Sequence, residues 1–321
     1  MDKPALYPWL QASWKNLLEQ HKQGKLAHAY LLSGLPGLGK AGFARFVSSA
    51  LLCLDLSEHG ACGHCKTCHL LAADTLPDFY ELLPEGKSQT IRIDQVRKLC
   101  AHLILTPQIA SMKIAVIQVA DSMNVASANS LLKTLEEPTA DTLLILVTDF
   151  PNRLLPTIRS RCQQLHLNPP PHEEALQWLG AQQVDGAETL LSLTSGAPLA
   201  ALRDSESGYL ERRTAVFADF IGLIRGQANI LAVSESWQKT YFPDCLYWLR
   251  SWVEDMIRLK MVDEPPLLEN TDIVSDLKAG SKRLDLKALY ARLSLVQTAI
   301  QQSSTTVNHQ MLLDEVLYPW N

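Results

Sequence analysis

A glycine-rich turn between an apolar segment and an amphipathic one limits what this chain can fold into. Residues 29–34, AYLLSG, predict a buried strand, GLPGLGKAG from Gly34 to Gly42 predicts a loop, and residues 40–53, KAGFARFVSSALLC, predict a helix. Strand, glycine loop and helix follow one another in this order in phosphate-binding loops, where glycine backbone approaches phosphate oxygens and a lysine adds positive charge. The order indicates an α/β domain with a site for phosphate.

Apolar strands and helical patterns continue to alternate after this motif. Strands are predicted at DFYELLP (78–84), KIAVIQVA (113–120) and TLLILVT (142–148), with helices at 91–105 and 125–137. Near-continuous apolar strands between helices predict a parallel sheet covered on both faces. The run NPPPH, residues 168–172, ends this region, because three prolines halt both helix and strand. Beyond it the patterns are helical.

The phosphate loop lacks the partners that ATP hydrolysis requires. Ala41 stands where Ser or Thr would bind Mg²⁺. Near the end of the predicted strand at residues 113–120, Gln118 and Val119 stand where carboxylates would bind the metal and polarise water. Asp121 follows and is predicted to cap the next helix. Hydrolysis by the chain alone is therefore expected to be negligible, whereas nucleotide binding stays open. The loop residues that could still hold phosphate are Gly34, Gly37, Gly39 and Lys40.

Four of the seven cysteines lie together in CLDLSEHGACGHCKTC, residues 53–68. Thiolates at C-x-x-C spacing can converge on one cation from a tight turn, so Cys53, Cys62, Cys65 and Cys68 predict a structural Zn²⁺ site. One alternative is chance clustering of reduced cysteines. Another is an iron–sulfur cluster, which is disfavoured because Ala72 stands where that pattern has its fourth cysteine.

Other residues of the cysteine segment and the remaining cysteines have lesser roles. Possible substitute ligands are His59, His64 and His69. The isolated cysteines, predicted to be buried small apolar residues, are Cys100, Cys162 and Cys245.

Charge and hydropathy narrow the class of protein. The chain has 34 acidic and 29 basic side chains, a formal net charge of -5, so it does not attract nucleic acid as a whole. No apolar run is long enough for a membrane span and no secretory signal is present, which predicts a cytoplasmic protein. Two further readings stay open at this point: a free-standing P-loop ATPase or kinase, and a zinc-dependent nucleic-acid binder, although Lys66 is the only basic residue of the cysteine segment besides histidines.

Two motifs carry a family resemblance. LLKTLEEP, residues 131–138, and Ser160-Arg161-Cys162 resemble motifs of the AAA+ clamp-loader family. The cysteine segment, the opening YPWL, the HAYLLSG strand and the altered QVAD strand narrow the resemblance to an accessory subunit of the bacterial DNA polymerase III clamp loader. VNHQMLLDEVLY, near the end, resembles the family's final helix.

The resemblance implies an α/β AAA+ P-loop domain with a parallel sheet and an inserted zinc module at residues 1–168. A small helical lid domain at 169–207 and an all-α C-terminal collar domain at 208–321 would follow. It also implies a ring with tau or gamma and delta subunits, which acts on the sliding clamp and primer-template DNA.

Each ATP in such a ring is held by one subunit's loop and completed by the neighbour's arginine. Arg161 matches that trans-acting arginine, with Arg159 as a second candidate; the alternative for Arg161 is a surface ion pair with Glu136 or Glu137.

Two further positions imply a passive subunit. Thr148 matches the first sensor position, where a hydroxyl could touch phosphate; the alternative is a strand-end threonine without that role. Leu199 stands where active relatives carry a sensor arginine, with Arg203 one helical turn later. The resemblance thus implies an ATPase-deficient, comparatively rigid subunit that helps to load the clamp in DNA replication.

Overall fold

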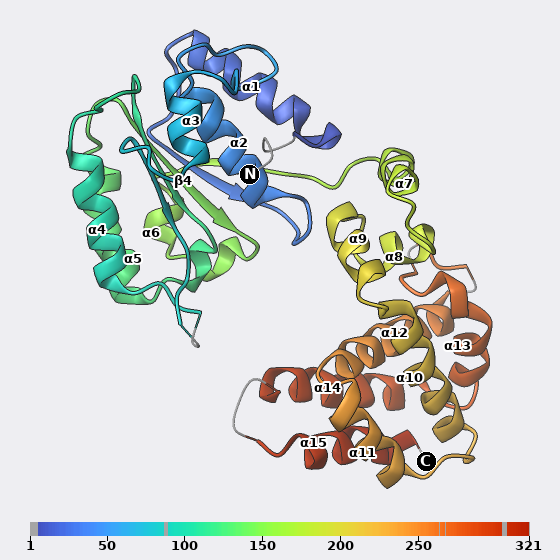
Figure 1. Cartoon of the computed structure of the whole chain (residues 1–321). Coiled ribbons are helices and arrows are strands. Elements are labelled where there is room, and N and C mark those ends of the chain that lie inside the picture. Colours follow the sequence, from blue (N-terminus) through green and yellow to red (C-terminus); the bar gives the residue numbers. More distant parts are fainter. Residues whose placement is uncertain (1–5, 87–88, 263, 267, 304–306, 321) are drawn as a thin grey trace. The chain divides into compact units, whose positions relative to one another are not determined.

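The run of three prolines at residues 169–171 divides the chain. The structure is a computed structural model that describes residues 6–86, 89–262, 264–266, 268–303 and 307–320. One compact unit extends to Pro170 and a second begins at Pro171 (Figure 1). The predicted stop is confirmed, because residues 168–171 form neither helix nor strand and helix α7 begins at His172. None of the described helices is long and apolar enough to cross a membrane.

Among the described residues, five parallel strands form one sheet in the order β2-β3-β4-β1-β5. Four of them lie where the apolar runs predict strands. The sequence does not predict β5, because its residues QQLH are polar and mostly exposed at the sheet's edge. The strands are β1 (Ala29–Ser33), β2 (Phe79–Leu82), β3 (Lys113–Ile117), β4 (Thr142–Thr148) and β5 (Gln163–His166).

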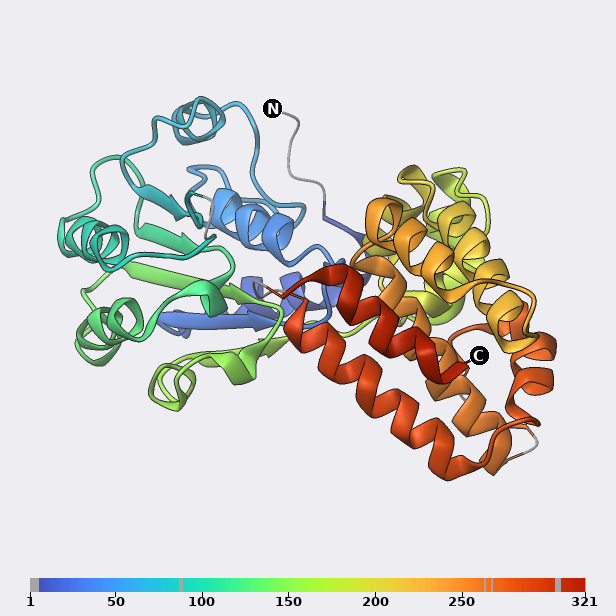
Figure 2. The same cartoon turned by 90° about the horizontal axis from the view of Figure 1, so that it is seen from below.

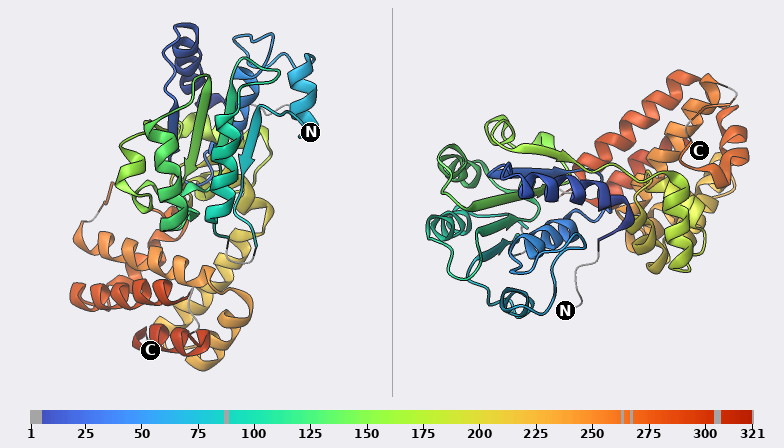
Figure 3. Two further views of the ribbon diagram at one scale, coloured as in Figure 1. Left: turned by 90° about the vertical axis from the view of Figure 1, so that its left-hand side faces the viewer. Right: turned by 90° about the horizontal axis from the view of Figure 1, so that it is seen from above.

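Helices cover both faces of the sheet (Figures 2 and 3). Successive side chains of β1 belong to the two different layers. Leu31 belongs to the apolar core shared with α4 and α5, whereas Leu32 faces Leu17 of α1 and Val47 of α2. The predicted covering of both faces is confirmed. The helices of this unit are η1 (Pro8–Leu10), α1 (Gln11–Lys22), α2 (Lys40–Leu51), α3 (Lys66–Ala72), α4 (Ile93–Ile104), η2 (Ala120–Ser122), α5 (Val125–Glu136), η3 (Pro151–Arg153) and α6 (Pro156–Arg159).

Two apolar cores lie among the described residues of the second unit. A small one joins α7, α8 and α9, and a larger one joins the later helices around tryptophans that include Trp237, Trp248 and Trp252. The predicted division into lid and collar falls at the turn between α9 and α10 and stays a prediction. The helices are α7 (His172–Ala181), α8 (Ala187–Leu193), α9 (Pro198–Glu206), α10 (Tyr209–Ile224), α11 (Ile230–Thr240), α12 (Asp244–Met261), η4 (Thr271–Ile273), α13 (Val274–Ser281), α14 (Leu286–Gln302), α15 (His309–Leu317) and η5 (Tyr318–Trp320).

A buried carboxylate fixes the loop that leads into β3. Asp78 is fully buried, and its oxygens accept backbone N–H groups at 2.7 Å from Gln108, 2.7 Å from Ile109 and 2.8 Å from Ala110. Lys113 Nζ lies 3.8 Å from the same carboxylate. Burial alone would raise the pKa of Asp78, but these hydrogen bonds and the lysine lower it below its ordinary value.

We expect Asp78→Asn to lower the free energy of unfolding at neutral pH by about 3 kcal/mol, because Lys113 stays buried without its partner. A lowered folded-state pKa stabilises the protein above the unfolded-state pKa of about 3.9, and this stability is lost as the pH falls through the folded-state value. The difference between wild type and variant should therefore shrink in acid. Urea unfolding over a pH series measures it, and a difference independent of pH would contradict the assignment.

Candidate functional site

The glycine loop follows β1 and lies against the end of β5. A Cβ atom added at Gly34 would lie 2.4 Å from the carbonyl oxygen of Leu167. That oxygen belongs to the backbone that continues β5, where Leu167 N donates to Ser33 O at 2.8 Å, so it cannot move aside. Gly39 has a left-handed φ of 87° and precedes α2. The loop therefore has the shape that the sequence predicts.

Lys40 is folded back onto the loop that carries it. Its side chain is 4% exposed, and Nζ lies 2.6 Å from Asp149 Oδ1. The same nitrogen donates to the carbonyl oxygens of Gly34 at 2.8 Å and Leu35 at 2.5 Å. An ammonium group has three N–H donors, so these contacts satisfy all of them. The group that would hold phosphate is thus occupied within the chain.

The position beyond β3 offers no carboxylate free for a metal. Gln118, 4% exposed, donates through Nε2 to Glu81 Oε1 at 2.8 Å. Arg45 Nε in turn donates to both oxygens of Glu81, at 2.9 and 2.8 Å. Glu81 was not predicted as part of the site, although a charged residue within the apolar strand FYEL is a usable signal. Its carboxylate is neutralised by the guanidinium, and Ala41 and Val119 add no oxygen ligand.

The proposed sensor hydroxyl is also paired internally. Thr148 is fully buried and donates to Asp121 Oδ1 at 2.6 Å, while Phe150 N donates to Thr148 Oγ1 at 3.0 Å. The prediction that Asp121 caps the next helix is wrong. The short turn η2 separates β3 from α5, so Asn124 is the cap and accepts Ser127 N at 2.8 Å.

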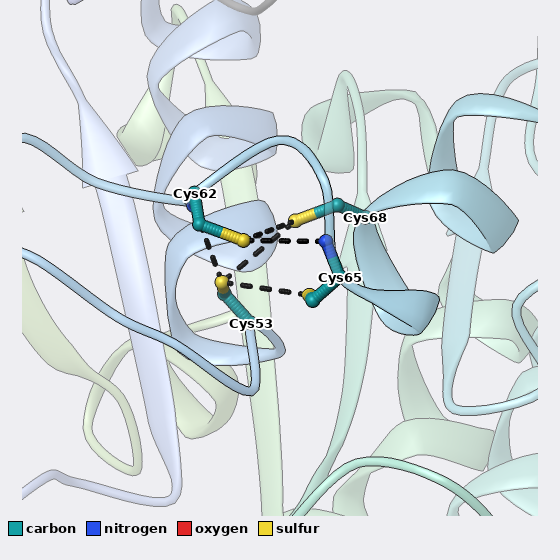
Figure 4. A group of neighbouring side chains, drawn as sticks. All are labelled: Cys53, Cys62, Cys65 and Cys68. Atoms are coloured by element: carbon teal, nitrogen blue, oxygen red, sulfur yellow. Dashed lines mark hydrogen bonds between the residues drawn. The ribbon is translucent and has the colours of Figure 1, made fainter.

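The four clustered cysteines point their sulfurs at one another (Figure 4). Sulfur–sulfur distances are 3.8 Å for Cys53–Cys65, 4.0 Å for Cys62–Cys68 and 3.7 Å for Cys53–Cys68. Four thiolates at about 2.3 Å from a central Zn²⁺ lie about 3.8 Å apart in a tetrahedron. The backbone N–H groups of Cys62 and Cys65 each donate to a cluster sulfur at 3.3 Å, as they would to thiolates. The cluster could hold one metal ion.

The histidines lie outside this group of four sulfurs. His64 is near Cys62 and exposed Asp55 in a separate grouping. Burial raises the pKa of Cys162 and of Cys245 to about 12 each, which keeps both thiols protonated and unreactive. The prediction that these two are buried is confirmed, whereas Cys100 is half-buried.

The cysteine segment packs on the two helices beside the glycine loop. Trp14 Nε1 of α1 donates to Glu58 O at 2.8 Å, and the Trp14 ring meets Phe46 of α2 edge to face at 5.1 Å. A Cβ at Gly60 would lie 2.7 Å from the Phe46 ring. The segment is therefore anchored to the fold through an aromatic contact as well as through its sulfurs.

Arg161 lies at the surface, in the connection between β4 and β5. Its Nη1 donates to Thr157 O at 3.0 Å and its Nη2 lies 2.6 Å from Glu136 Oε1. The side chains of Arg161 and Glu136 are 36% and 49% exposed. The ion pair with Glu136, one of the two alternatives from the sequence, is thus present. Arg159 Nη1 donates to Asn152 Oδ1 at 3.2 Å.

Leu199 and Arg203 lie in α9 of the second unit, where Arg203 pairs with Asp204 at 3.0 Å. Leu199 brings no cation to its position.

Comparison with known proteins decides the family. The family described as DNA polymerase III, delta subunit, matches residues 9–171, and its C-terminal counterpart matches residues 207–321. A protein of Pseudomonas aeruginosa named DNA polymerase III subunit delta prime is 36% identical over 98% of this chain and 97% of its own length. The Escherichia coli protein of that name is 32% identical over 97% of this chain and 94% of its length. This chain belongs to the DNA polymerase III subunit delta prime family.

Membership of the delta prime family confirms the resemblance that the motifs indicate, and with it a subunit of the DNA replication machinery. The predicted α/β domain with a parallel sheet, followed by helices, is also confirmed. Among solved structures, a gamma subunit-related protein of Thermotoga maritima aligns over 94% of this chain and 97% of its own, with 19% identity and a TM-score of 0.43. That likeness adds nothing to the family assignment.

Two glycines of this delta prime family member, Gly60 in the cysteine segment and Gly42 in α2, should respond oppositely in stability when changed to alanine. Gly60→Ala should lower the free energy of unfolding by about 1–3 kcal/mol, because the Phe46 ring is held by Trp14 and the φ of Gly60 is 99°. Gly42→Ala in α2 meets nothing within 4 Å and should raise it by about 0.5–1 kcal/mol. Thermal unfolding of both variants is the measurement, and a Gly60→Ala protein as stable as Gly42→Ala would contradict the packing.

Proposed function

We propose that this chain is the non-hydrolysing subunit of a clamp-loader ring, in which it helps to place a sliding clamp on primer-template DNA. In that ring it supplies Arg161 to the ATP site of a neighbouring tau or gamma subunit. The observation that carries the proposal is the contrast between two groups: Lys40 is buried with three internal partners, whereas Arg161 stands at the surface.

The state of the chain's own loop supports the absence of hydrolysis. Asp149 provides the negative charge that phosphate would bring to Lys40, and Ala41 cannot ligate Mg²⁺. Glu81, whose carboxylate accepts a hydrogen bond from Gln118 at the end of β3, is held by Arg45. Losing the metal ligand and the carboxylates costs on the order of 10²-fold or more in rate for each part. Gly34, Gly37, Gly39 and Thr148 then serve the fold rather than a bound nucleotide.

Arginine suits action in a neighbour's site. A guanidinium keeps its charge at all relevant pH values and donates two parallel hydrogen bonds to phosphate oxygens. At a subunit boundary it can stabilise the charge that builds up on the phosphate being cleaved. Ring interfaces join different faces of neighbouring subunits, so one face can lose its site while the other keeps its arginine.

The cysteine cluster in the proposal holds a structural Zn²⁺. Four sulfur ligands at tetrahedral separations leave no open position for substrate or water, and soft thiolates favour zinc over hard cations. The metal would keep residues 53–68 folded against α1 and α2. An iron–sulfur cluster is the rival occupant.

We also propose partners and domains by analogy with the family. The tau or gamma subunits and the delta subunit are the proposed neighbours in the ring, with the clamp and DNA reached through the assembly. Residues 169–207 form the proposed lid, in which Leu199 gives no arginine to a nucleotide, and residues 208–321 form the proposed collar that holds the ring together.

Arg161→Ala tests the proposal in a loader reconstituted with its clamp and primed DNA. The rate at the neighbour's site should fall by about 10³-fold or more, so that the assembly loses that site's share of ATP turnover. Arg159→Ala, in the same β4–β5 connection, is the matched control and should keep most of the ATP turnover. Steady-state ATP hydrolysis measures both, with size-exclusion chromatography to establish that each ring assembles. Unchanged turnover in Arg161→Ala, or ATP hydrolysis by the isolated chain, would overturn the proposal.

The zinc assignment is tested by metal analysis of the purified chain. We expect about one Zn²⁺ for each chain, and its removal by a chelator should lower the midpoint of thermal unfolding. Cys62→Ser should lose the metal, while Cys100→Ser, outside the cluster, should retain it. Bound iron with visible absorbance would favour the iron–sulfur alternative, and a chain purified without metal and indifferent to chelator would exclude both.

A further inference from the structure

We propose that Glu136 is a positioning residue for Arg161, which holds the guanidinium in place before the neighbour's phosphate arrives. The inference rests on the proposed role of Arg161 in a neighbour's ATP site. Glu136 is the last residue of α5 and belongs to neither the glycine loop nor the cysteine cluster.

The base of Arg161 is fixed by the core. Its backbone N–H donates to Ile158 O at 3.0 Å. Ile158 is fully buried and Cys162 is 7% exposed, so buried side chains lie on both sides of Arg161 in the sequence. The backbone therefore presents this side chain from a rigid part of the β4–β5 connection.

The tip of Arg161 is fixed by two acceptors. Thr157 O takes a hydrogen bond from Nη1 at 3.0 Å, and Glu136 Oε1 lies 2.6 Å from Nη2. A guanidinium carries five N–H groups, and these contacts use two of them. The remaining donors and the 36% exposure of the side chain leave room for a phosphate, so being held by Glu136 and binding phosphate are compatible.

The position of Glu136 in its helix is otherwise unfavourable. A carboxylate at the last residue of an α-helix faces the negative end of the helix dipole. The helix itself is anchored by Leu131 and Leu135, which are at most 3% exposed. Arg161 supplies the positive charge that makes a carboxylate favourable at this site.

The ion pair between Arg161 and Glu136 adds little to the stability of the fold, and its main effect is to order the arginine side chain in advance. A half-exposed ion pair contributes little to stability, whereas a free arginine side chain loses much rotamer entropy when a phosphate orders it. A guanidinium that is already held has lost that entropy before ATP is cleaved. The effect should appear in kcat rather than in the KM for ATP, because the contact strengthens as charge builds up in the transition state.

The experiment compares Glu136→Ala, Glu136→Gln and the control Glu137→Ala in the reconstituted loader. Glu136→Ala should lower kcat at the neighbour's site by about three- to tenfold, with the KM for ATP unchanged. Glu136→Gln should stay within about twofold of wild type, because its amide oxygen can accept the same N–H. Glu137→Ala should behave as wild type, since Arg161 pairs with Glu136 and not with Glu137. In an Arg161→Ala background, Glu136→Ala should have no further effect.

Three outcomes would overturn the inference. Faster turnover in Glu136→Ala would make Glu136 a competitor of phosphate, and unchanged turnover would make the pair incidental. An effect of Glu136→Ala that persists without Arg161 would make its role structural. The proposed function fails separately, through an Arg161→Ala loader with wild-type turnover.

Discussion

The ion pair of Lys40 with Asp149 makes the glycine loop a structural part of the α/β unit. An almost fully buried ammonium group needs all its donors satisfied, and here a carboxylate and two loop carbonyls do so without phosphate. The pair also ties the glycine loop after β1 to the segment that leaves β4. The loop is thereby part of the fold, and the strand order that places β1 between β4 and β5 makes this contact possible.

The two ends of the β4–β5 connection serve different purposes. Because β4, β1 and β5 are parallel, the last residue of β4 lies at the carboxyl ends of the strands and the first residue of β5 lies at their amino ends. Asp149 follows β4 beside the chain's own loop, whereas Arg161 precedes β5 beside the end of α5. Loss of the catalytic side chains at the carboxyl ends, where Ala41 and Val119 stand, therefore leaves Arg161 at the amino ends unaffected. This separation gives a physical basis for the proposed role, in which the chain supplies Arg161 to a neighbour without hydrolysing ATP in its own loop.

Much of the fold could be predicted from local pattern, and the site only in part. Apolar runs located β1, β3 and β4, and cysteine spacing located the cluster, because these signals lie within short stretches of sequence. The edge strand β5 has no apolar run, so the sequence does not predict its pairing with β1. The sequence wrongly predicts a helix cap at Asp121, because its partner, Thr148, lies 27 residues away and gives no local signal. The Gln118 and Glu81 pair, 37 residues apart, likewise has no local signal.

The number of ATP molecules bound and cleaved in a minimal complex of this chain with one ATP-hydrolysing neighbour tests the central claim most directly. Equilibrium binding of labelled ATP gives the number bound, and rapid-quench measurement of a single turnover gives the number cleaved, each with the wild-type chain and with Lys40→Met. The account predicts cleavage only of the ATP held by the neighbour, in the same amount for both chains, because Lys40 is engaged within its own loop. A further equivalent of ATP that is bound or cleaved by the wild-type complex and lost with Lys40→Met would contradict it.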